Sequence, residues 1–189
     1  MCPRSRRVFI TLVTHRSTLA MKRCLVLFAA LLPPAVHGGW VDPTGRPIPD
    51  AENRRSIGAF GVHIVLAANE AQFRKTWHSS RTPPRLNAIN TVRRGEMVSA
   101  LLIFHGCTPA ATGACEVVSS FIIEGPDGGR TPGGGGPVWT EAPARPGLLQ
   151  LGQAGMSVVF DPSDPVGDYR IIANIEDRVS GRVLSVWLV

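Results

Sequence analysis

Hydrophobic and polar positions alternate with a period of two along several short stretches of this chain. The clearest is "YRIIANIE", where Tyr169, Ile171, Ala173 and Ile175 fall on one face and polar side chains fall on the other. Because successive side chains of a strand point to opposite faces, this pattern predicts a half-buried β-strand.

Other apolar, β-branched stretches predict further strands at residues 60–68, 115–124 and 182–189, and one or two short strands within 148–160. Residues 96–106, "EMVSALLIFHG", are apolar on both faces. We therefore expect a central strand here, with the core on one side and a cover on the other.

A single short helix is predicted directly after the first of these strands. Asn69 can accept from the first turn as an N-cap, with Gln72 three residues on as its reciprocal partner. Phe73 and Trp77 stand four residues apart and share one helical face. We expect this helix to cover the central strand.

Two stretches are predicted to lack packed elements. Residues 39–58 are rich in Pro and Gly and have no apolar periodicity, which indicates an extended N-terminal arm. Residues 125–137, "GPDGGRTPGGGGP", carry so many glycines that we expect a flexible loop. Strands of six to ten residues separated by turns, with one short helix, predict a mainly β protein with the architecture of an antiparallel β-sandwich.

The run "DPVGDYRIIANIEDRVSG" resembles the Pro-x-Gly-x-Tyr ending of many immunoglobulin-like extracytoplasmic β-sandwiches. The whole chain after residue 38 is also similar to small exported bacterial proteins of unassigned function. The resemblance implies an immunoglobulin-like fold and export. It also implies that the hydroxyl of Tyr169, the only tyrosine in the chain, ties down a loop. It carries over no catalytic residue.

The N-terminal region has the pattern of a signal peptide. Met21-Lys22-Arg23 is a basic start, and residues 24–32 form an apolar run too short to span a bilayer. Small residues at 36 and 38 favour cleavage before Gly39. We expect residues 1–38 to be an upstream segment and signal peptide, 39–58 an arm and 59–189 the sandwich. Whether synthesis starts at Met1 or Met21 stays open.

The net charge of the chain becomes different once this segment is removed. The full chain has 20 Lys+Arg, 14 Asp+Glu and a net charge of +6, which suggests a nucleic-acid or anionic-membrane partner. Six of the basic residues lie within 1–38, which holds no acidic residue, so the remainder is neutral. We therefore expect no nucleic-acid partner. The excess of Arg over Lys and the abundance of Ala, Gly and Pro are typical of a GC-rich bacterial genome, and we predict a periplasmic or secreted protein.

Cys107 and Cys115 are the cysteines that remain after residue 38. They stand at the facing ends of two predicted strands, so a disulfide can join them across the turn between. An exported protein meets an oxidising compartment where such a bond persists. A redox pair would require the Cys-x-x-Cys spacing, which is absent.

A metal site is the alternative use of this region. His105 and Cys107 are two positions apart and would project to one face of a strand, a donor pair suited to copper or zinc. Further ligands would have to come from His63, His78 or a carboxylate, and none has diagnostic spacing. A disulfide would consume the Cys107 thiolate, so the two interpretations exclude each other. We predict no cofactor and no metal.

Hydrolytic motifs are missing from the sequence, which has no Gly-x-Ser-x-Gly, His-Glu-x-x-His or Ser-x-x-Lys. Asp161 and Asp164 in "DPSDP" are interpreted as turn residues rather than as an acid/base pair or a calcium site. We predict no catalytic residue. An envelope hydrolase, or an inhibitor of one, stays as an alternative, and the enzyme would need a spatial cluster of distant residues such as His63, His78 and Asp161.

Two tryptophans have no obvious place in the core. Trp40 lies in the predicted arm and Trp139 follows the glycine-rich stretch, so both are candidates for contacting a partner. We therefore expect a non-catalytic binding or assembly module of the bacterial cell envelope, with a protein or glycan as its partner.

Overall fold

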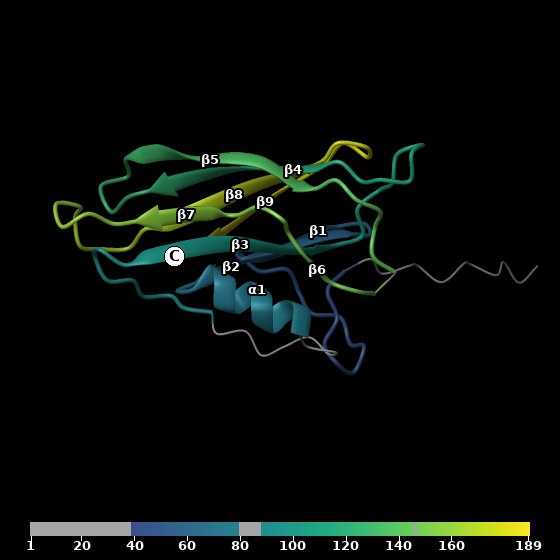
Figure 1. The fold of residues 1–189 in the computed structure, drawn as a ribbon, viewed down its shortest axis with the longest axis horizontal. Coiled ribbons are helices and arrows are strands. Elements are labelled where there is room, and N and C mark those ends of the chain that lie inside the picture. The colour runs from purple at the N-terminus through teal and green to yellow at the C-terminus, as the bar shows by residue number, and fades with distance from the viewer. Residues whose placement is uncertain (1–38, 80–87, 146) are drawn as a thin grey trace, which may run out of the picture. The chain divides into compact units, whose positions relative to one another are not determined.

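The structure, a computed structural model, describes residues 39–79, 88–145 and 147–189. The predicted signal peptide lies outside the described residues. The described chain is mainly antiparallel β, with two sheets and one short helix, so the predicted β-sandwich class is confirmed. Figure 1 shows the two sheets as stacked layers, with the helix on the outer side of one of them.

The first sheet contains five strands. Its order is β1 (Arg54–Ile57), β2 (Phe60–Ala67) and β3 (Met97–His105), and the far edge of β3 pairs with both β6 (Gln150–Leu151) and β7 (Met156–Val159). The second sheet has the order β5 (Arg130–Trp139), β4 (Val117–Glu124), β8 (Arg170–Asp177) and β9 (Arg182–Leu188).

The main core lies between the sheets. On β2 and β3 the even-numbered residues face inward, and Val62 and Phe104, which stand opposite each other in the register, are both fully buried. From the other sheet, β4 contributes Val117 and Phe121, and the predicted alternation on β8 buries every second residue from Ile171 onward. The predicted alternation of β8 and the predicted strand at β4 are therefore confirmed.

A second, smaller core covers the outer face of β2 and β3. The helix α1 (Glu70–Ser79) lies over this face (Figure 1) and buries Phe73 against Val65 and Leu101. Asn69 Oδ1 accepts from the backbone N–H of Gln72 at 2.9 Å, as expected for an N-cap. The predicted burial of β3 on both faces, with the helix as the cover, is confirmed.

The extended arm predicted over residues 39–58 needs correction. Its last residues form β1, which pairs with β2 from Arg54 opposite His63 to Ile57 opposite Phe60. Its first residues are held by Trp40, which is only 7% exposed in the outer core. Sequence periodicity missed both contacts because a four-residue edge strand and a single anchoring ring leave no repeat to detect.

The flexible loop predicted over residues 125–137 is also corrected. Strand β5 runs from Arg130 to Trp139 and pairs with β4 through the glycines, with irregular register at two points. A Cβ atom added to Gly135 would lie 2.3 Å from the carbonyl oxygen of Ser119. The glycines here permit the backbones of β4 and β5 to approach each other closely. Composition alone cannot distinguish such glycines from those of a flexible loop.

Candidate functional site

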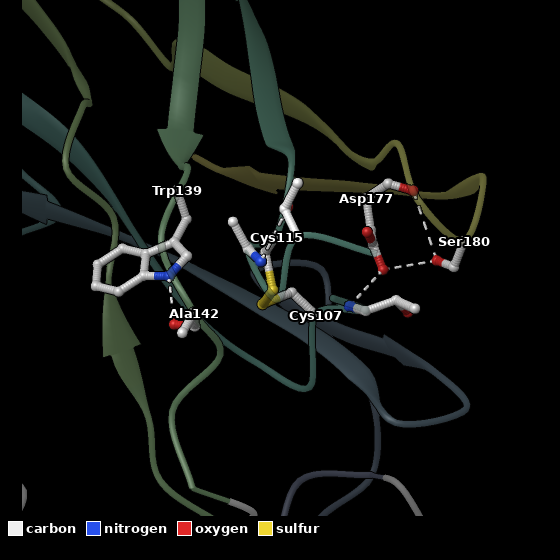
Figure 2. Close-up of a disulfide and its surroundings, with 9 residues drawn as sticks. Cys107, Cys115, Trp139, Ala142, Asp177 and Ser180 are labelled. Atoms are coloured by element: carbon white, nitrogen blue, oxygen red, sulfur yellow. Dashed lines mark hydrogen bonds between the residues drawn. A yellow bond between two sulfur atoms is a disulfide. The ribbon is translucent and has the colours of Figure 1, made fainter. Parts of the chain in front are cut away.

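The cysteine pair joins the end of β3 to the start of β4. Cys107 and Cys115 are linked by a disulfide with a Cα–Cα distance of 6.1 Å, and both side chains are buried (Figure 2). The bond connects the two sheets, because β3 and β4 belong to different layers. The geometry matches the structural bond predicted from the sequence.

Asp177, which no sequence motif marks, holds the same region from the other side. Its side chain is fully buried, and Oδ2 accepts from the backbone N–H of Thr108 at 3.0 Å and from Ser180 Oγ at 2.6 Å (Figure 2). Oδ1 is buried and has no hydrogen-bond partner among the described residues. The carboxylate therefore fastens the β8–β9 turn to the first residue after Cys107.

His105 and Cys107 do not share a face, which corrects the geometry assumed for a metal pair. Gly106 between them has φ +71°, so the strand ends at His105 and the chain turns. The His105 ring contacts Trp40 on the outer side of the sheet at a centroid distance of 4.9 Å, whereas Cys107 lies in the core between the sheets. Among the described residues there is no group of three or more His, Cys, Asp or Glu that could hold a metal ion.

Trp40 is the centre of an aromatic cluster on the outer face of the first sheet. Its ring meets those of His105 and His63 edge-on, and its Nε1 donates to the carbonyl oxygen of Arg55 at 3.2 Å. The premise that Trp40 has no core to join is therefore wrong. Its ring packs inside the protein and anchors the first described residues to the sheet.

Trp139, the other candidate contact residue, is half-buried at the end of β5. Its ring packs edge-on against Phe104 at a centroid distance of 5.7 Å, and Nε1 donates to the carbonyl oxygen of Ala142 at 3.1 Å (Figure 2). The indole is thus held by the main core and by its own turn. Its contact with a partner stays a prediction.

His63 is a partly buried neutral base beside Trp40. Burial and the nearby Arg54 guanidinium lower the pKa of His63 from 6.5 to about 4. Its Nε2 lies 3.3 Å from Asn53 Nδ2, so the neutral ring accepts a hydrogen bond that a protonated ring would lose.

We expect this histidine to make the protein sensitive to mild acid. Between pH 6.5 and about 4, His63 is protonated in the unfolded chain and neutral in the folded chain. The free energy of unfolding therefore falls as the pH falls through this window. The full shift corresponds to about 3 kcal/mol, and since the ring is only partly buried we expect a loss of about 1–2 kcal/mol.

Urea denaturation at pH 7 and pH 4.5 measures this loss. His63→Gln should remove about 1–2 kcal/mol of the difference between the two pH values, whereas His78→Gln, which changes an exposed histidine of α1, should leave it as in the original chain. Equal pH dependence in all three proteins would show that His63 does not contribute.

A cavity opens at the end of the sandwich opposite the disulfide, where β2 and β9 end and β8 begins; we call it the end cavity. It has a volume of about 310 Å³, which lies at the lower end of the roughly 300–1,000 Å³ of typical ligand pockets. Its apolar walls continue the main core and are formed by Leu66, Ile89, Val92, Phe160, Ile171 and Leu188.

Polar side chains and one exposed valine line the mouth of the end cavity. The polar side chains are those of Asn90, Thr91, Arg94 and Asp168. The valine is Val166, which is 85% exposed. None of these residues was singled out from the sequence, because they come from two loops that lie about 75 residues apart along the chain.

Tyr169 fixes one of these loops. Its hydroxyl donates to the carbonyl oxygen of Pro165 at 2.9 Å, which is the loop-tying bond that the resemblance implied. Desolvation and the carboxylate of Asp164 raise the pKa of Tyr169, so the hydroxyl is protonated at neutral pH and acts as the donor. The bond holds the Pro165–Tyr169 segment at the mouth of the end cavity.

Asp161 and Asp164 form the turn predicted for them. The backbone N–H of Asp161 donates to Asp164 Oδ2 at 2.6 Å, and the N–H of Asp164 donates to the carbonyl oxygen of Asp161 at 3.0 Å. His63, His78 and Asp161, the residues considered for a hydrolase, lie on the outer face of β2, in the last turn of α1 and in this turn, and none of them lines the end cavity.

Comparisons with known proteins do not assign a family. No protein-family model matches the chain. No curated protein is found to be similar to it either. In the part of the chain that the structure describes, no helix has the length and apolar character needed to cross a membrane.

Proposed function

We propose that this protein is an exported, non-catalytic binding module of the bacterial cell envelope, built on an immunoglobulin-like sandwich, and that its ligand site is the end cavity. The observation that carries the proposal is an apolar cavity, open at one end of the sandwich, whose walls belong to the main core. A packed interior normally leaves few voids larger than a water molecule, and this cavity reaches the size of a small ligand pocket.

Export is supported by two independent features. Residues 21–38 have the composition of a signal peptide, and a buried disulfide joins the two sheets. Trp40 is not part of this binding surface, because its ring packs inside the protein. The mouth of the end cavity lies on loops held by rigid strands, as is usual for the sites of binding proteins.

The binding of an uncharged fluorescent dye tests this site. N-phenyl-1-naphthylamine should bind the purified protein saturably at one site, with increased fluorescence, because the dye exchanges water for apolar walls. Val92→Phe places a ring in the end cavity and should weaken dye binding at least about tenfold, the effect of about 1.4 kcal/mol.

The matched control is Val183→Phe, which adds the same ring to a valine that is 58% exposed on β9 and does not line the cavity. It should bind the dye as the original chain does. Equal binding by both variants, or no saturable binding by the original chain, would exclude the end cavity as an apolar ligand site.

A further inference from the structure

The mouth of the end cavity carries one positive and one negative side chain. Arg94 and Asp168 are the charged residues among those that line the cavity, and both are exposed. Arg94 donates one hydrogen bond to the carbonyl oxygen of Asp164, which fixes the guanidinium beside the mouth and leaves further N–H donors. For the Asp168 carboxylate, the described residues supply neither a hydrogen bond nor an ion pair.

The two charges set what kind of polar group can sit at the mouth. From these two side chains, an anionic head is attracted by the guanidinium and repelled by the carboxylate, and for a cationic head the two effects are reversed. A charged head at similar distances from both therefore gains no net Coulomb attraction from this pair. A neutral group with both an acceptor and a donor can use both side chains, accepting from Arg94 and donating to Asp168. A primary or secondary amide has this combination.

The interior sets what must be attached to that group. Its walls are aliphatic and aromatic, and about 310 Å³ corresponds to about ten water molecules or a chain of about ten heavy atoms. Val166 at the mouth is an aliphatic side chain that is 85% exposed. A ligand chain leaving the cavity would cover it.

We propose that the end cavity binds a small uncharged amphiphile, with an aliphatic chain of about ten heavy atoms inside and an amide-like head held between Arg94 and Asp168. This inference rests on the proposed function, because it names the chemistry of the ligand of the same site.

Three probes of equal chain length test the head group. Octanamide, octanoate and octylammonium are titrated into the original protein, and binding is followed by NMR shifts of the Val166 and Leu188 methyl groups. Octanamide should bind at least about fivefold more tightly than either charged probe, which is the effect of one hydrogen bond.

Exchanging the charges should exchange the preference. Asp168→Asn leaves Arg94 alone at the mouth and should make octanoate the tightest of the three probes, whereas Arg94→Gln leaves Asp168 alone and should favour octylammonium. Both residues are exposed and lie outside the core, so neither variant should disturb folding. Thr91→Val, an uncharged change at the same mouth, should leave the order of the probes unchanged.

The outcomes separate the two proposals. Tightest binding of octanoate or octylammonium to the original protein would overturn the neutral head, and so would an unchanged order in both charge variants. If the naphthylamine dye binds and no octyl probe shifts the methyl groups, the cavity is a ligand site and the amphiphile is wrong. If neither the dye nor any octyl probe binds, both proposals fail.

Discussion

Replacement of Asp177 by alanine is expected to lower the free energy of unfolding by about 3 kcal/mol. The side chain is fully buried, and its Oδ2 satisfies two donors, the N–H of Thr108 and the hydroxyl of Ser180. Alanine removes the acceptor and leaves both part-buried donors without this partner. Urea denaturation of the two proteins at neutral pH measures the difference.

Asp177→Asn is the matched control for this substitution. The carboxylate uses only Oδ2 among the described residues, while Oδ1 is buried without a partner. An asparagine that places its oxygen at Oδ2 keeps both bonds and removes a buried charge, so we expect a change of less than about 1 kcal/mol. An alanine variant as stable as the asparagine variant would show that the two hydrogen bonds contribute little.

Loss of the disulfide is the second large effect. Cys107 and Cys115 are eight residues apart, and removing a cross-link that closes so short a loop should destabilise the protein by about 2–3 kcal/mol. The double variant Cys107→Ala/Cys115→Ala makes this change without leaving a free thiol. Its urea midpoint, compared with that of the oxidised protein, gives the loss.

Chemical reduction of the disulfide in the original protein is the control, because it breaks the bond without changing the two side chains to alanine. The reduced protein should have the stability of the double alanine variant to within about 1 kcal/mol, since the cavity left by two small side chains is minor. A double variant as stable as the oxidised protein would mean that the β3–β4 connection is held without the bond. The bond and Asp177 hold adjacent residues, so combining both changes should cost less than the sum of the two.

Several elements of the fold could be predicted because their signals are local. The alternation along β8, the apolar run of β3 and the Asn69 cap each depend on residues a few positions apart. They follow from how side chains project from strands and helices. The disulfide belongs to the same group, since its two cysteines flank a single turn.

The corrections to the N-terminal arm and to the glycine-rich stretch have one physical cause, which is contact between residues distant in the sequence. Trp40 is buried only because β2 and β3 pair in the folded protein and place the rings of His63 and His105 against its indole. The glycines of β5 have the composition of a loop, and they form a strand because the backbone of β4 pairs with them.

By itself the sequence determined the fold class, the helix and its cap, and the disulfide, together with the expectation of export from its first 38 residues. Only the tertiary structure decided that Trp40 is buried, that Asp177 fastens the disulfide loop, and that Arg94 and Asp168 both line an apolar cavity. The reason is physical. Alternation and capping are encoded within a few residues of chain, whereas a cavity exists only where separate loops and strand ends fail to fill the space between two sheets.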